Sequence, residues 1–304
     1  MIRKKILIIQ RRSGIGDMCA FLPFIRKISE YRKGSDFYIF TSSRSKANEL
    51  LEYDPVIKNI VFYENYKTTK DFIRFLKFNS FNEVFIFHYS FRFFFLCFIS
   101  RIKKIFIYGL LKRKKNNIIE EAKNFTLKSL KISKLDTVFK CKIYTKDLNI
   151  KKKQEIVIGI GGSGQNKKWP IENFIKLIEM INDYKKSSFL IAGGHEENKE
   201  AEEMISILKN VEIISLCKLN VKSAIDKINS AKLYIGNDTG FMHICGSLGI
   251  KSYGLFGDTP TNYVDYNNLI TPLIPENFNK ISHDSMAMNK ILVDYVYKKI
   301  LNNL

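Results

Sequence analysis

The sequence alternates short apolar runs with segments of helical periodicity, and this alternation constrains its fold more than any other feature. In the first half, apolar runs at 5–10, 36–41, 60–63 and 84–87 indicate strands. Helical spacing is found over 18–31 and 45–53. Strands that alternate with helices favour a parallel sheet covered by helices on both faces. We therefore expect an α/β protein.

The pattern starts afresh in the second half of the chain. It predicts strands at 156–160, 188–192, 211–215 and 233–236, and helices over 171–184, 196–209, 221–230 and 285–301. A length of 304 residues suits two domains. We expect one Rossmann-like domain over residues 1–150 and another over 151–304, with a linker at 149–155. Two such domains place a ligand cleft between them, outside the carboxyl ends of both sheets.

The chain is strongly basic, with a formal net charge of +20. Such a charge favours an anionic partner: a nucleic acid, an anionic membrane surface or a phosphorylated substrate. Much of the excess lies in the runs at 101–117 and 151–153. A codon bias toward lysine explains the same excess equally well. No nucleic-acid recognition motif accompanies the basic runs, so we do not expect a nucleic-acid-binding protein.

Cysteine usage and hydropathy point to the cytoplasm. The 5 cysteines are widely spaced and form no CxxC pair, which predicts reduced thiols and no structural metal. The first apolar run is too short for a signal peptide. The aromatic stretch at 84–100 contains His88 and Arg92 and is shorter than the ~20 apolar residues of a membrane span. We expect a strand followed by an aromatic helix there.

The loop after the first predicted strand reads "QRRSGIGDMCAFLPFI". Its glycines permit a sharp turn, which leaves Asp17 at the mouth of a helix. The carboxylate suits the positive end of that helix. It equally suits a general base that acts on a hydroxyl nucleophile.

The loop at 159–170, "GIGGSGQNKKWP", contains the pattern G-x-G-x-x-G. A dinucleotide fingerprint requires the helix to start within the glycines. Here Pro170 predicts a start several residues later. A long glycine loop that carries Ser163, Lys167 and Lys168 is instead typical of a phosphate cradle. We expect Trp169 to pack in the core.

Two further loops carry polar residues after predicted strands. In "LIAGGHEENKEAEEM", Glu196 and Glu197 suit either ribose hydroxyls or the first turn of a helix. The stretch "YIGNDTGFMHICGSLGIKSYGLFG" (234–257) indicates a strand, a polar corner, a helix and a second strand, with Asp238, Thr239, Gly240 and His243 at the start of the helix. They serve as helix caps, or they face an anionic ligand together with the free N–H groups of that helix.

The stretches "SGIGDMCAFLP", "KKWP", "GGHEE" and "GNDTGFMHICGSLG" resemble, in order and spacing, those of glycosyltransferase family 9, the heptosyltransferases. The resemblance implies a GT-B-type fold of two Rossmann-like domains facing a central cleft. It implies inverting transfer of a sugar, typically heptose from ADP-heptose, onto a lipopolysaccharide inner-core acceptor. No metal and no cofactor are implied.

The resemblance also assigns the two domains and their residues. The first domain would bind the acceptor and the second the nucleotide sugar. Asp17 would be the general base, with Gly16 and Arg92 on the acceptor side, although "FIFHYSFRFFFLC" around Arg92 departs from the family pattern. The donor residues would be Ser163 and Lys167 at the phosphates, Glu197 or Glu196 at the ribose, and Asp238, Thr239, Gly240 and His243 at the sugar and diphosphate.

A lipid-linked, phosphorylated acceptor would place the enzyme at the inner face of the cytoplasmic membrane. Each Lys or Arg near such an anionic surface contributes roughly 1 kcal/mol of attraction. The alternative is a catalytically silent GT-B protein that binds a nucleotide, a glycan or an anionic membrane surface.

Overall fold

The computed structural model describes residues 3–108, 117–133, 138–146 and 154–304. The chain divides into two compact units, Met1–Lys142 and Ile143–Leu304, and each is described by itself. The predicted boundary at residue 150, the lysine run at 151–153 and residues 109–116 of the basic run at 101–117 lie outside the described residues.

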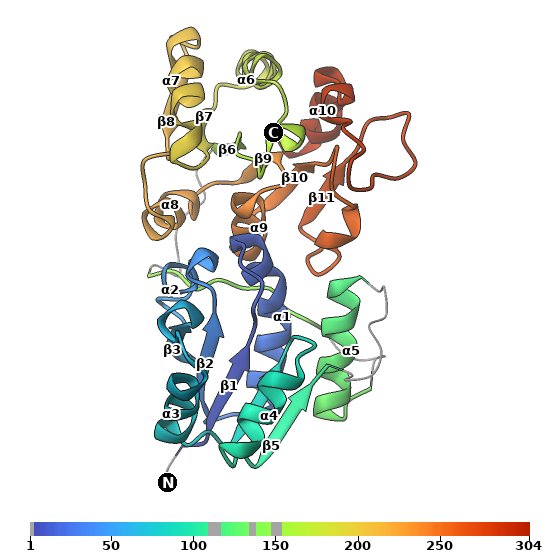
Figure 1. The fold of residues 1–304 in the computed structure, drawn as a ribbon. Coiled ribbons are helices and arrows are strands. Elements are labelled where there is room, and N and C mark those ends of the chain that lie inside the picture. Colours follow the sequence, from blue (N-terminus) through green and yellow to red (C-terminus); the bar gives the residue numbers. More distant parts are fainter. Residues whose placement is uncertain (1–2, 109–116, 134–137, 147–153) are drawn as a thin grey trace. The chain divides into compact units, whose positions relative to one another are not determined.

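The first unit is built on a parallel sheet with the strand order β3-β2-β1-β4-β5 (Figure 1). The chain moves outward from β1 to β3, then crosses back to β4 beside β1. The point between β1 and β4 is therefore the topological switch point of this sheet. Its strands are β1 (Lys5–Ile9), β2 (Asp36–Thr41), β3 (Ile57–Phe62), β4 (Glu83–Ile86) and β5 (Lys104–Ile107).

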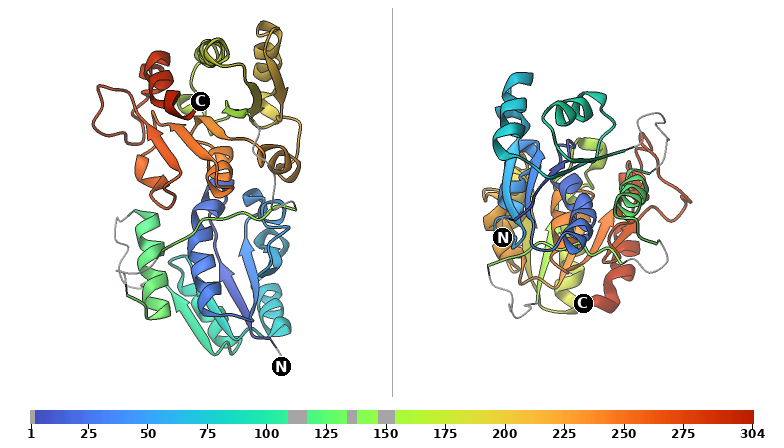
Figure 2. Two further views of the ribbon diagram at one scale, coloured as in Figure 1. Left: turned by 180° about the vertical axis from the view of Figure 1, so that it is seen from behind. Right: turned by 90° about the horizontal axis from the view of Figure 1, so that it is seen from below.

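Helices cover both faces of this sheet. On one face, side chains of α3 and α4 pack in a core that includes Leu7 and Ile9 of β1. On the other face α1 and α5 lie together (Figure 2). The helices are α1 (Ile15–Tyr31), α2 (Ala47–Leu50), α3 (Thr69–Asn79), α4 (Phe91–Ile99) and α5 (Ile118–Leu130).

The second unit has a parallel sheet with the order β11-β10-β9-β6-β7-β8, so its switch point lies between β6 and β9. Helices α6, α7 and α10 pack on one face, and α8 and α9 lie on the other (Figure 1). Its strands are β6 (Glu155–Gly159), β7 (Ser188–Ala192), β8 (Glu212–Ser215), β9 (Leu233–Asn237), β10 (Lys251–Leu255) and β11 (Ile270–Leu273). Its helices are α6 (Ile171–Tyr184), α7 (Asn198–Ile207), α8 (Val221–Ile228), α9 (Gly240–Ser247) and α10 (Val293–Ile300).

Two glycines face each other where β6 and β9 pair. Gly159 and Gly236 are register partners at the carboxyl ends of these strands. A Cβ on Gly236 would lie 2.4 Å from the carbonyl oxygen of Gly159. A Cβ on Gly159 would lie 1.9 Å from the hydroxyl oxygen of Tyr234. Both positions therefore need glycine because the backbone and the tyrosine fill the space.

The structure confirms the predicted α/β class, the two parallel sheets and the aromatic helix within 84–100. No helix in the described part of the chain is long and apolar enough to cross a membrane. The predicted helix at 45–53 is a single turn, and α1 begins three residues before the predicted 18. The sequence analysis did not identify α3, α5, β5 or β11.

The predicted helix over 285–301 is wrong in its first part, since α10 begins at Val293. Residues 284–288 instead form a loop that is fixed by contacts with the end of β10. The amide of Met286 donates to a carboxylate oxygen of Asp258 at 3.0 Å. The amide of Ala287 donates to the carbonyl oxygen of Gly257 at 2.9 Å. These long-range hydrogen bonds replace the ones that a helix would form.

Candidate functional site

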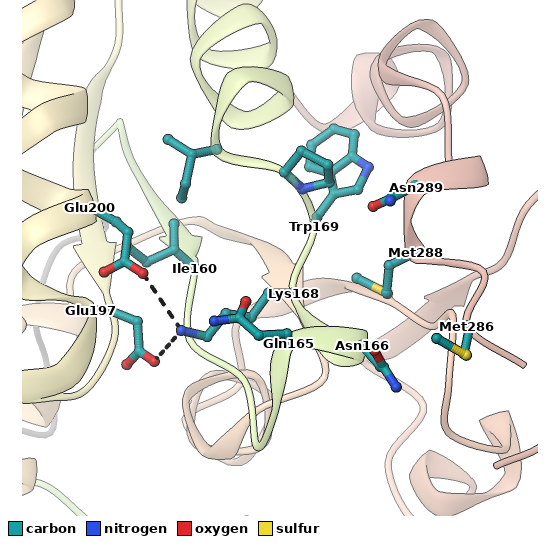
Figure 3. A pocket seen from close by; sticks show the side chains of 12 residues that line it. Ile160, Gln165, Asn166, Lys168, Trp169, Glu197, Glu200, Met286, Met288 and Asn289 are labelled. Carbon is teal, nitrogen blue, oxygen red and sulfur yellow. Dashed lines mark ion pairs between the residues drawn. The ribbon is translucent and has the colours of Figure 1, made fainter. Parts of the chain in front are cut away.

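A pocket of about 420 Å³ lies in the second unit, beside the loop that follows β6 at the switch point (Figure 3). Ligands of open α/β sheets bind at this point, outside the carboxyl ends of the strands. The wall combines apolar side chains with a few polar ones, as is usual for small-molecule sites. The lining residues are Ile160, Gln165, Asn166, Lys168, Trp169, Pro170, Ile171, Glu197, Glu200, Met286, Met288 and Asn289.

The buried amide of Asn237, the last residue of β9, holds the loop after β6 in place. Its nitrogen donates to the carbonyl oxygens of Ile160 at 2.9 Å and Gly161 at 3.0 Å. Its oxygen accepts a hydrogen bond from the amide of Trp169 at 3.0 Å. One side chain thus fixes both ends of the glycine-rich loop.

Tyr234 supports this arrangement from the same strand. Burial raises the pKa of Tyr234 well above its usual value, so the hydroxyl stays protonated. It donates to the carbonyl oxygen of Asn237 at 2.8 Å.

The tryptophan in this loop is structural, as the sequence predicted. Trp169 is 1% exposed and packs edge-to-face on Phe174 of α6. Its indole N–H donates to the carbonyl oxygen of Ile291 at 2.9 Å. The indole therefore joins the loop to the segment before α10 and forms the base of the pocket.

An ion pair between Lys168 and Glu197 forms the polar wall (Figure 3). The ammonium nitrogen of Lys168 lies 2.8 Å from one carboxylate oxygen of Glu197 and 3.7 Å from Glu200. The other oxygen of Glu197 accepts the amide of Gly194 at 2.7 Å. Burial opposes the charge of Lys168, but the hydrogen bond to Glu197 and the surrounding carboxylates outweigh it and raise the pKa of the ammonium.

The start of α9 brings together the four residues that the sequence singled out there. Thr239 is the N-cap of α9, with Asp238 just before it and Gly240 as the first helical residue. His243 is buried, and its Nε2 lies 3.5 Å from a carboxylate oxygen of Asp238. Its Nδ1 lies 2.6 Å from the hydroxyl of Tyr266. The first amides of α9 have no partner within the helix, so this end attracts anions.

The other donor candidates occupy loops of the same unit. Ser163 is exposed in the glycine-rich loop, and Lys167 is half-buried at the end of the 3-10 turn Gln165–Lys167. Glu196 is exposed, whereas Glu197 is buried. Of these predicted residues, Glu197 lines the pocket. The sequence analysis assigned no role to Asn237; its one available signal was a polar residue directly at the end of an apolar strand.

In the first unit, Asp17 lies in the first turn of α1, directly after β1. One carboxylate oxygen accepts the amide of Gly14, the N-cap residue, at 3.1 Å. The other lies 2.5 Å from the Nε of Arg12. The side chain of Asp17 remains 29% exposed. Gly16 is also within the first turn of α1.

Arginines gather at the carboxyl edge of the first sheet. Arg92, in the first turn of α4, donates to the hydroxyl of Thr69 at 2.8 Å. Arg11, which the sequence analysis missed, stacks over the rings of Tyr63 and Phe93 at 4.9 and 5.5 Å. The 5 cysteines, all within the described residues, form no disulfide bond, and the same residues contain no cluster of three His, Cys, Asp or Glu side chains that could hold a metal ion.

Residues 108–288, more than half of the chain, match the family described as glycosyltransferase family 9 (heptosyltransferase). The chain belongs to this family. Among curated proteins it is similar to lipooligosaccharide heptosyltransferase 2 of Campylobacter jejuni serotype O:6. The two are 28% identical over 257 residues, which cover 81% of this chain and 79% of the relative. The same enzyme of serotype O:2 is 32% identical over 100 residues, which cover 32% of this chain and 31% of the relative.

Solved structures of this family share the fold. E. coli ADP-heptose LPS heptosyltransferase II superposes with a TM-score of 0.78 and 15% identity over 98% of both chains. E. coli heptosyltransferase WaaC with ADP superposes with a TM-score of 0.77 and 17% identity over 99% of this chain and 100% of that one. The glycosyltransferase therefore has the GT-B-type fold of two Rossmann-like domains that the resemblance implied.

Replacement of Asn237 by leucine tests its part in the site. Leucine keeps the volume but leaves two carbonyls and one amide unpaired, so we expect the free energy of unfolding to fall by about 3 kcal/mol. We also expect the affinity for ADP to decrease because the loop after β6 is no longer fixed. Chemical denaturation and calorimetry measure the two effects.

Asn198→Ala is the matched control, since its side-chain amide donates a solvent-exposed hydrogen bond to Glu202. It should change neither quantity. An Asn237→Leu protein with unchanged stability and affinity would contradict this assignment.

Proposed function

We propose that this glycosyltransferase transfers a heptose from ADP-heptose, with inversion, to a phosphorylated saccharide of the lipopolysaccharide core. The observation that carries the proposal is the pocket at the switch point of the second unit, with its apolar floor and its Lys168–Glu197 wall. Its volume of about 420 Å³ suits a nucleoside. Support comes from relatives named lipooligosaccharide heptosyltransferase 2 and from solved relatives with ADP and with ADP-2-deoxy-2-fluoro heptose.

In this proposal the second unit binds the donor. The nucleoside occupies the pocket, where Met288 and Ile160 contact the base and Glu197 or Glu196 accepts hydrogen bonds from the ribose. The diphosphate lies against Ser163, Lys167 and the first amides of α9, which starts at Thr239 and Gly240. Asp238 and His243 contact the sugar.

Positive charge at these groups stabilises the leaving diphosphate. When the anomeric C–O bond breaks, negative charge develops on the β-phosphate oxygen. In this proposal, the ammonium of Lys167 and the amide dipoles of α9 stabilise that charge. Such preorganised groups need no reorientation during the reaction.

Asp17 is the general base in this mechanism. It takes the proton from an acceptor hydroxyl, whose oxygen attacks the anomeric carbon on the face opposite ADP. The hydrogen bonds from Gly14 and Arg12 orient the carboxylate, and each of its oxygens keeps a second lone pair for the proton. Gly16, Arg92 and Arg11 lie at the same edge of the sheet and bind the acceptor and its phosphates.

Asp17→Asn tests the base. The amide oxygen still accepts the Gly14 hydrogen bond, but the side chain takes no proton. We expect kcat for transfer from ADP-heptose to fall on the order of 10²- to 10⁴-fold. We expect the affinity for ADP, measured by calorimetry, to stay unchanged.

Asp71→Asn is the matched control because Asp71 caps α3 as Asp17 caps α1. It should retain turnover. Loss of ADP binding in Asp17→Asn would indicate a structural role for Asp17. Binding without any turnover in the unmodified protein would favour the catalytically silent alternative.

Lys167→Ala tests the phosphate contact separately from the pocket wall. A charge-assisted hydrogen bond contributes about 1.5–3 kcal/mol, so we expect the affinity for ADP to fall at least about tenfold. The free energy of unfolding should change by less than about 0.5 kcal/mol. Lys168→Ala, which leaves Glu197 without its ion-pair partner, should instead lower both affinity and stability.

Lys176→Ala, at an exposed position of α6, serves as the control for charge alone. If Lys167→Ala binds ADP normally and Lys168→Ala does not, Lys168 holds the phosphates and the assignment to Lys167 is wrong.

A further inference from the structure

Helix α4 exposes a row of phenylalanines, which we call the aromatic face: Phe91, Phe94, Phe95 and Phe98. Three of these side chains, those of Phe91, Phe95 and Phe98, are 62%, 59% and 64% exposed. The rings of Phe94 and Phe98 stack at 6.5 Å. Soluble proteins rarely expose a contiguous patch of this kind unless it contacts a partner or a membrane.

The aromatic face is not needed for the core. At about 100° per residue, its four positions fall within an arc of about 100° on the helix surface. The opposite side of α4 already packs in the core through Phe93, Leu96 and Cys97. Four of the five phenylalanines of this nine-residue helix therefore lie on its outer side, and one, Phe93, lies on its inner side.

Basic side chains flank the aromatic face at the carboxyl end of α4. Arg101 and Lys103 are exposed, and Lys104 follows as the first residue of β5. The ammonium nitrogen of Lys104 lies 3.6 Å from one carboxylate oxygen of Glu83. The other oxygen of Glu83 accepts a hydrogen bond from Arg32. The combination of exposed aromatic rings and cations is typical of surfaces that insert into the headgroup region of an anionic bilayer.

We propose that the aromatic face of α4 docks this enzyme on an anionic lipid bilayer, with Arg101 and Lys103 contacting the headgroups. The net charge favours a lipid bilayer over a second copy of the chain as the partner of the aromatic face. A net charge of +20 repels an identical molecule and attracts an anionic surface. The proposal goes beyond the transfer reaction, since it concerns a surface and not the donor pocket.

The length of α4 determines how it lies. Nine residues rise only ~14 Å, which is less than half of the ~30 Å hydrocarbon core. The helix therefore lies along the interface with its rings at the headgroup boundary and its inner side still packed on the sheet.

Vesicle sedimentation without donor or acceptor tests the proposal. The probes are vesicles of phosphatidylethanolamine with phosphatidylglycerol, and vesicles of phosphatidylcholine alone. We expect binding to the anionic vesicles only. The triple variant Phe91→Ser, Phe95→Ser, Phe98→Ser should bind at least about tenfold more weakly. Arg101→Gln with Lys103→Gln should weaken binding by roughly fivefold per charge and reduce its salt dependence.

The controls are matched in exposure and charge. Tyr184→Ser, Ile207→Ser and Leu292→Ser remove three apolar side chains that are 61%, 53% and 61% exposed in the second unit. Lys176→Gln with Lys209→Gln removes two exposed charges there. Both controls should bind vesicles as the unmodified protein does, and all variants should bind ADP equally well.

A second measurement remains informative if the serine variant does not fold. Phe95→Trp keeps the apolar surface, and brominated lipids should quench its fluorescence, whereas Tyr184→Trp should be unaffected. The native Trp169 is buried and supplies a constant background. Equal vesicle binding by the triple variant, absence of quenching in Phe95→Trp, or a dimer that the triple variant dissolves would each overturn the proposal.

Discussion

The buried amide of Asn237 is the contact on which the site of the second unit depends. It joins the end of β9 to both ends of the loop after β6, and so spans the switch point of the sheet. The facing glycines Gly159 and Gly236 let these two strands approach closely enough for that contact. Trp169 then extends the connection to the segment before α10. The loop that lines the pocket is consequently fixed to the end of β9 and to the segment before α10.

The two units apply the same local rule with different results. In each, a loop leaves a central strand and leads to a helix whose start carries polar side chains. In the first unit the polar group is the carboxylate of Asp17, held by Gly14 and Arg12. In the second, the start of α9 presents its amides beside Asp238 and His243. An acidic group thus marks the proposed acceptor side, and positive helix ends and lysines mark the donor side.

Local signals in the sequence predicted much of this architecture. The apolar alternation located nine of the eleven strands, and Pro170 located the start of α6. The residues Asp238 to His243 were correctly placed at a helix start because caps and glycines act over a few residues. The Lys168–Glu197 pair was not predictable, since it joins a loop to a different strand end. The loop at 284–288 was mistaken for helix because Asp258 and Gly257, far away in sequence, bind its amides.

The central claim is that the second unit binds an adenosine diphosphate sugar without a metal ion. Calorimetric titration of the unmodified protein with ADP, UDP, GDP and CMP, each with Mg²⁺ and with EDTA, tests it most directly. The account predicts that ADP binds most tightly and equally well in both buffers. Preference for another nucleotide, or binding that disappears with EDTA, would contradict it.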